Sequence, residues 1–91
     1  MASLKVFKPQ RREPMPPGGV LVSEWAVGRR TVRLVQDVTV TVGVSALPAE
    51  WSPDRPRKLG KREWREYRAG RDAHHQRVAD IIGAPVASAE L

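Results

Sequence analysis

The stretch VLVSEWAVGRRTVRLVQ, residues 20–36, decides the fold, because apolar and polar side chains alternate along it with the period of a β-strand. If Gly28 and Arg29 are the two central residues of a type II′ turn, with glycine at the first position, Val27 pairs with Arg30. Counting outward puts alternate pairs on opposite faces: Trp25–Val32, Ser23–Leu34 and Leu21–Gln36 on one, and Ala26–Thr31, Glu24–Arg33 and Val22–Val35 on the other. The first face is mostly apolar and the second holds an opposite-charge pair, so these residues are predicted to form an antiparallel hairpin with one buried face.

The same alternation continues beyond the hairpin as far as Val44. A tight turn at Gln36 and Asp37 would send these later valines to the wrong face, so we expect a long strand bent near this point, or a turn with an odd number of loop residues. Residues 4–7 are candidates for a short edge strand that pairs with residues 38–44.

A helix is predicted over residues 61–82. With Gly60 as N-cap, Glu63 falls at the third helical position, where its carboxylate can reach back to the cap. Good helix formers continue to Ile82, and Gly83 ends the helix. The chain is therefore expected to have an α+β fold, in which a small, mostly antiparallel sheet is packed by one C-terminal helix.

One stripe of this helix is expected to cover the sheet, because five apolar or aromatic residues gather on it at 100° per residue: Trp64, Tyr67, Val78, Ile81 and Ile82. Trp64 also lies where Leu59 would meet it as a hydrophobic staple. Arg71 and His74 fall inside the same stripe. We expect them to reach past the edge of the helix or to pair with a carboxylate of the sheet such as Glu24 or Asp37, and the functional alternative is that Arg71 anchors an anion in a partly open groove.

The predicted organisation is a Pro-rich extended arm over residues 1–19, one domain over residues 20–83 and a short flexible tail over residues 84–91. Within the arm, Arg11, Pro14 and Pro17 match the spacing of a basic residue followed by PxxP, which docks into aromatic grooves. Such short patterns arise often by chance, so we favour an arm that wraps its own domain or stays loose.

All of the net charge lies in one quarter of the chain. Residues 55–77 contain nine of the sixteen Lys and Arg residues and three acidic residues, which accounts for the formal net charge of +6. Lys61, Arg65 and Arg68 follow helical spacing and form a ridge, and Arg55, Arg57 and Lys58 lead into it from the preceding loop. A positive ridge of this kind attracts phosphates, although a charge run is also typical of an ordinary solvated face.

The sequence thus favours a small binding module without catalysis, which contacts nucleic acid or a nucleic-acid-associated complex. Its predicted binding residues are the cations above together with Arg71, and Trp51 in the loop as a residue that stacks on a base. The alternative is a protein-binding adaptor or inhibitor, of the kind that mobile elements encode, which uses the same surface against an acidic protein.

Other chemistry is not indicated. His74 and His75 are adjacent and point about 100° apart on a helix, so they do not form a metal pair, and the chain has no cysteine. No carboxylate pair is placed for acid and base work, Gly18 and Gly19 precede a strand rather than a helix, and 91 residues leave little room for a substrate cleft. We therefore expect neither an enzyme nor a cofactor, metal or small-molecule substrate. The lack of cysteine and of a long apolar run predicts a soluble cytoplasmic protein that does not enter a membrane.

Overall fold

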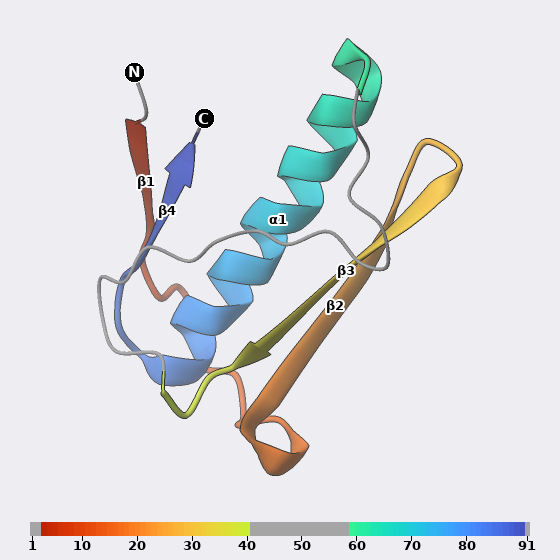
Figure 1. The fold of residues 1–91 in the computed structure, drawn as a ribbon. Helices are drawn as coiled ribbons and strands as arrows, with labels where there is room; N and C mark the ends of the chain where they lie inside the picture. Colours follow the sequence, from red (N-terminus) through yellow and green to blue (C-terminus); the bar gives the residue numbers. More distant parts are fainter. Residues whose placement is uncertain (1–2, 41–58, 91) are drawn as a thin grey trace.

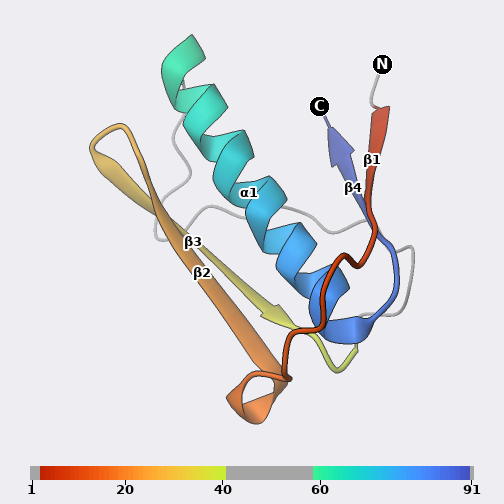
Figure 2. The ribbon, with the colours of Figure 1, turned by 180° about the vertical axis from the view of Figure 1, so that it is seen from behind.

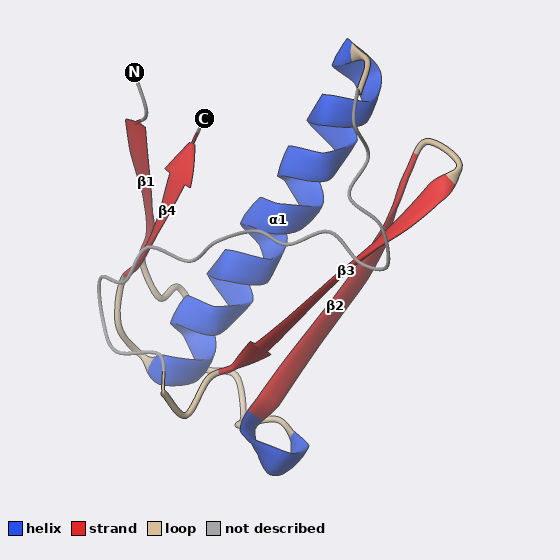
Figure 3. Ribbon diagram, in the orientation of Figure 1, coloured by secondary structure: helices blue, strands red, loops and turns tan. Residues whose placement is uncertain are grey.

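In the computed structural model, which describes residues 3–40 and 59–90, one long helix lies between two small antiparallel sheets (Figure 1). The elements in chain order are β1 (Ser3–Phe7), the 3-10 turn η1 (Pro17–Gly19), β2 (Val20–Val27), β3 (Arg30–Asp37), α1 (Lys61–Ile82) and β4 (Val86–Glu90). One sheet is formed by β1 and β4 and the other by β2 and β3, as Figure 3 shows. The predicted α+β class is confirmed.

The β2–β3 hairpin has the predicted register along its whole length, from Val27 opposite Arg30 to Leu21 opposite Gln36. Its inward face is buried as expected and contributes four core residues: Leu21, Val27, Val32 and Leu34. At the turn, Gly28 has the positive φ of 62° that favours glycine. Its amide donates a hydrogen bond to Glu66 Oε1 at 3.1 Å, which ties the turn to the first half of α1.

The hairpin ends at Asp37, and the chain does not continue as a bent strand through the next residues, which form a turn. The Asp37 carboxylate accepts hydrogen bonds from the hydroxyl and from the amide of Thr39, the latter at 2.9 Å. These bonds, the hydroxyl bond first, lower the pKa of Asp37. The predicted extension of the strand is therefore interrupted where the bend was expected, and residues 41–44 lie outside the described residues.

The predicted partner of the edge strand is described only over residues 38–40, which form a turn, whereas the edge strand itself is present as β1. It pairs with β4, in a register that runs from Phe7 opposite Val86 to Ser3 opposite Glu90. The segment expected to be a tail thus contains a strand. Gly83 reverses the chain after α1 with a φ of 67°, and Phe7 and Val86 are then buried against Val78 of the helix. This burial stabilises β4, which could not be predicted from its small residues alone.

Apolar contacts form two clusters, one at each end of α1. The cluster at the C-terminal end joins both sheets to the helix and contains Phe7, Leu21, Val38, Val78, Ala79 and Val86. The cluster at the N-terminal end contains Val27, Val32 and Tyr67, with Trp25 and Leu59 at its border. Gly70 allows this second cluster to close, because a Cβ at this position would clash with the Trp25 ring.

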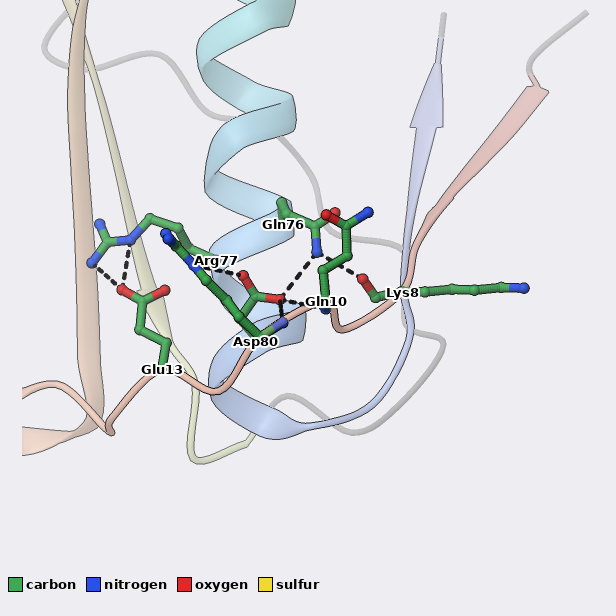
Figure 4. Close-up of polar contacts among 7 residues, drawn as sticks. Lys8, Gln10, Glu13, Gln76, Arg77 and Asp80 are labelled. Carbon is green, nitrogen blue, oxygen red and sulfur yellow. Dashed lines mark hydrogen bonds and ion pairs between the residues drawn. The ribbon is translucent and has the colours of Figure 1, made fainter.

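The Pro-rich arm is fastened to the C-terminal end of α1 by polar contacts (Figure 4). Asp80 Oδ1 accepts hydrogen bonds from the amide of Gln10 at 2.9 Å and from the side chain of Gln76 at 3.1 Å. Arg77 donates two hydrogen bonds to Glu13 Oε1, at 2.9 and 2.7 Å. Figure 2, from behind, shows the segment after β1 crossing this end of the helix. Through these contacts, residues 10–13 of the arm lie against the C-terminal end of α1.

The fastened arm leaves little support for the PxxP interpretation. Arg11, which would give that motif its basic residue, forms an ion pair with Asp80 (3.7 Å from Nε to Oδ2). A polyproline ligand must present its basic residue and its prolines together to a partner. Here the basic residue is directed to the helix of its own chain.

Candidate functional site

Four cations lie exposed on the first two turns of α1: Lys61, Arg62, Arg65 and Arg68. None of them forms an ion pair with any part of the chain that the structure describes. At 100° per residue, three of them fall within an arc of about 60° and span about 10 Å along the helix axis. These three, Lys61, Arg65 and Arg68, are here called the basic ridge, and they are the predicted ridge residues.

The acidic side chains of the same turns point elsewhere. Glu63 and Glu66 lie about 140 to 160° from Lys61 around the helix, on the side of the hairpin. Glu63 Oε1 accepts a hydrogen bond from the amide of Gly60 at 3.3 Å, which confirms the predicted N-cap contact, and Glu66 binds the hairpin turn. Both carboxylates therefore accept hydrogen bonds from backbone amides, and the electrostatic potential over the basic ridge stays positive.

Asp72, the acid nearest to the C-terminal end of the ridge, is also engaged. Its Oδ2 lies 2.7 Å from Lys5 Nζ, and its Oδ1 lies 3.7 Å from a guanidinium nitrogen of Arg71. Asp72 therefore pairs with Lys5 and Arg71, and it forms no ion pair with a cation of the basic ridge.

Arg71 does not belong to the exposed surface, although it was predicted as a binding residue. Its guanidinium lies 5.7 Å from the centre of the Tyr67 ring, and the residue is only 6 % exposed. Burial against an aromatic ring, with Asp72 beside it, agrees with the structural role that was weighed against an anion anchor. Its charge is largely offset within the fold.

The remaining predicted binding residues, Trp51, Arg55, Arg57 and Lys58, lie outside the described residues. Leu59 and Gly60 are described and lead directly into the basic ridge.

Trp64 was predicted to lie in the buried stripe, and this is wrong: it is 41 % exposed. Tyr67 takes the place against the inner face of the hairpin, and Trp64 lies about 60° further around the helix. The Trp64 and Tyr67 rings meet edge to face, with centroids 5.7 Å apart. The site therefore contains an exposed aromatic residue that sequence reasoning assigned to the core. Its position only about 40° from Arg68 on the helical wheel was the available signal.

His74 belongs to a buried chain of hydrogen bonds between α1 and the hairpin. Its Nε2 lies 2.7 Å from Gln36 Oε1, and its Nδ1 lies 2.6 Å from Ser23 Oγ. An amide oxygen only accepts, so Nε2 carries the proton and the Ser23 hydroxyl donates to Nδ1. The predicted carboxylate partner was wrong, because both ring nitrogens are taken by neutral side chains. Burial, with His75 and Arg77 nearby, lowers the pKa of His74 to about 4.

His75 is buried next to it, with its ring 5.7 Å from that of Phe7 and 5.6 Å from that of His74. Neither of its nitrogens has a hydrogen-bond partner among the described residues. Burial first, and then the charge of Arg71, lower the pKa of His75 to about 4. Both histidines are therefore neutral in the folded protein at neutral pH.

The hydrogen bonds join the hydroxyl of Ser23, the imidazole of His74 and the amide of Gln36. Nucleophilic enzymes also use a hydroxyl, an imidazole and an orienting group in such a series. In this fold His74 is only 1 % exposed, and its low pKa makes it a weak base at neutral pH. The arrangement instead fixes the position of α1 over the hairpin, because each of its three members would be left unsatisfied by a shift of the helix.

The described residues show no group of three or more His, Cys, Asp or Glu side chains that could hold a metal ion. Within residues 3–40 and 59–90, no helix combines the length and the hydropathy that crossing a bilayer requires. Comparisons of the chain with protein-family models, with curated proteins and with solved structures gave no match.

Proposed function

We propose that this protein is a small, non-enzymatic binding module that contacts nucleic acid through the basic ridge. The observation that carries the proposal is that Lys61, Arg65 and Arg68 are exposed and lack ion pairs with described residues, while the neighbouring carboxylates are directed to backbone amides. Cations held on one face of a rigid helix can each neutralise a phosphate and release its counterions. The loop cations Arg55, Arg57 and Lys58 would extend the same track.

The absence of catalysis in this proposal is supported by the placement of the buried histidines. His74 is enclosed between α1 and the hairpin, out of reach of a solute, and its role in holding the two elements together accounts for its hydrogen bonds. The exposed part of α1 carries cations and one indole ring, which suit recognition rather than proton transfer.

The proposal is tested by measuring oligonucleotide affinity between 20 and 200 mM salt for the wild type and for the triple variant Lys61→Gln, Arg65→Gln, Arg68→Gln. For the wild type we expect affinity to fall steeply with salt, and for the variant we expect the slope of log K against log salt to be smaller by about 2 to 3. The matched control is Lys8→Gln, Arg12→Gln, Arg33→Gln, which removes three exposed cations elsewhere. Affinity that is absent at 20 mM salt, or a control that loses as much as the ridge variant, would contradict the proposal.

The second candidate is an adaptor that binds another protein. It is favoured by the outer face of the hairpin, where Val22 and Val35 pair across the strands and are 40 % and 59 % exposed, with Val20 beside them. An apolar patch next to a polar or charged surface is typical of protein interfaces. A partner that stays bound after nuclease treatment and high salt, and is lost in a Val22→Thr, Val35→Thr variant, would support the adaptor over the nucleic-acid module.

A further inference from the structure

Trp64 is held in place by contacts in a series of three aromatic rings, which begins with Trp25 in the hairpin. The Trp25 and Tyr67 rings have centroids 6.1 Å apart, and Tyr67 and Trp64 follow at 5.7 Å. Tyr67 is fixed because it is buried with Val27 and Val32. The exposed indole therefore rests edge to face on a buried ring, so little conformational entropy is lost when a second flat group covers it.

The basic ridge borders this indole on one side. Lys61 precedes Trp64 by three residues and Arg68 follows it by four, which are the spacings that bring side chains together on a helix. Arg65 lies further around the same side, about 100° from Trp64. A flat aromatic surface with a line of cations next to it has the two parts that bind a base and the phosphates that flank it.

This combination distinguishes single strands from duplexes. In a duplex both faces of each base are covered by stacking, and freeing one base costs a few kcal/mol. In a single strand the base faces are available, and stacking on an aromatic side chain contributes about 1 to 3 kcal/mol per base. Phosphate contacts alone would favour the duplex, because about 0.9 counterions are released per neutralised phosphate of B-DNA and about 0.7 per phosphate of a single strand.

We infer that the protein prefers single-stranded nucleic acid to duplex and stacks one base on Trp64, an inference that rests on the proposed function. The ridge supplies affinity that depends on salt, and Trp64 supplies the preference for unpaired bases.

Fluorescence anisotropy with a labelled twelve-residue oligothymidine, a duplex of the same length and an abasic strand of the same length tests this inference. We expect the wild type to bind oligothymidine about 5- to 150-fold more tightly than the abasic strand, and more tightly than the duplex. We expect Trp64→Ala to lose about 5- to 150-fold toward oligothymidine and less than twofold toward the duplex. Trp64→Phe, which keeps an aromatic face, should recover most of the loss. Circular dichroism before titration excludes variants that fail to fold.

The outcomes separate the inference from the proposed function. Equal affinity for oligothymidine and the abasic strand, or a Trp64→Ala variant that weakens single strand and duplex equally, overturns the stacking inference and leaves the ridge as a phosphate-binding surface. Absence of any binding by the wild type at 20 mM salt overturns both the stacking inference and the proposed function. A Trp64→Phe variant as weak as Trp64→Ala would also contradict stacking.

Discussion

The two halves of α1 use similar residues for different purposes. Residues 71–82 contain six of the seven buried residues of the helix, and they are enclosed by both sheets and by the arm. Residues 61–70 touch the hairpin through Tyr67 and Gly70 and present four cations to solvent. Most charged side chains of the enclosed half pair within the fold, as Asp72, Arg77 and Asp80 do, whereas the four cations of the open half form no ion pair with described residues. Burial, rather than residue type, assigns each group to structure or to binding.

The largest expected effect contrasts Tyr67 with Trp64, two aromatic residues three positions apart. Tyr67→Ala removes a buried ring from the cluster with Val27 and Val32 and should lower the free energy of unfolding by about 3 to 5 kcal/mol. Trp64→Ala removes the ring of a residue that is 41 % exposed and should lower it by about 2 kcal/mol. Urea unfolding of both variants measures the difference. Equal losses would mean that Trp64 belongs to the core after all.

Acid should weaken the enclosed half first. The pKa values of His74 and His75 are lowered to about 4 in the folded protein from 6.5, so the unfolded chain binds protons more readily. Stability is complete above pH 6.5 and is lost as the pH falls toward 4, by about 2 kcal/mol per histidine at pH 5. Thermal melts between pH 7.5 and 4.5 test this.

His75→Phe provides the matched variant for the acid series, because it keeps a flat ring beside Phe7 and removes both unsatisfied nitrogens. It should show about half the wild-type loss of stability between pH 7 and pH 5. An unchanged pH dependence would show that His75 is hydrated or charged in the folded state.

The arm provides a third comparison, because its described polar contacts with α1 are all made to the enclosed half. Asp80→Ala removes the acceptor for the amide of Gln10 and the side chain of Gln76, and should cost about 2 to 3 kcal/mol. Hydrogen exchange at Gln10 and Arg11 should accelerate more than exchange in the hairpin. Glu24→Ala, which removes an exposed carboxylate paired with Arg33, is the control and should cost about 0.5 kcal/mol or less. Unchanged exchange in the arm would mean that Asp80 does not fasten it.

The smallest expected effect is at Gly70, at the boundary between the two halves. Alanine is the better helix former by about 1 kcal/mol, yet Gly70→Ala should destabilise the protein by about 1 to 2 kcal/mol because its Cβ would meet the Trp25 ring. In a Trp25→Leu background the same change should become neutral or stabilising. A stabilising Gly70→Ala in the wild-type background would place the Trp25 ring away from the helix.

Local patterns predicted the elements that depend on neighbouring residues. Alternation and one glycine gave the hairpin register, and the Gly60 cap and Gly83 gave the bounds of α1. These features follow from φ preferences, short turns and side-chain periodicity, all of which act over a few residues. The basic ridge could also be predicted from the sequence, because helical spacing alone brings Lys61, Arg65 and Arg68 together.

Only the tertiary structure decided which surfaces are covered. The pairing of β1 with β4 joins residues 79 to 87 positions apart, and the small residues of β4 give no periodic signal of their own. The sheets also decided that Tyr67 is buried while Trp64 is exposed, that Arg71 is enclosed and that His74 meets Ser23 and Gln36. A sequence determines the directions in which the side chains of a helix point, but burial depends on which distant segments arrive to cover them. For this protein, that difference separates the part of the helix that holds the fold from the part left for a partner.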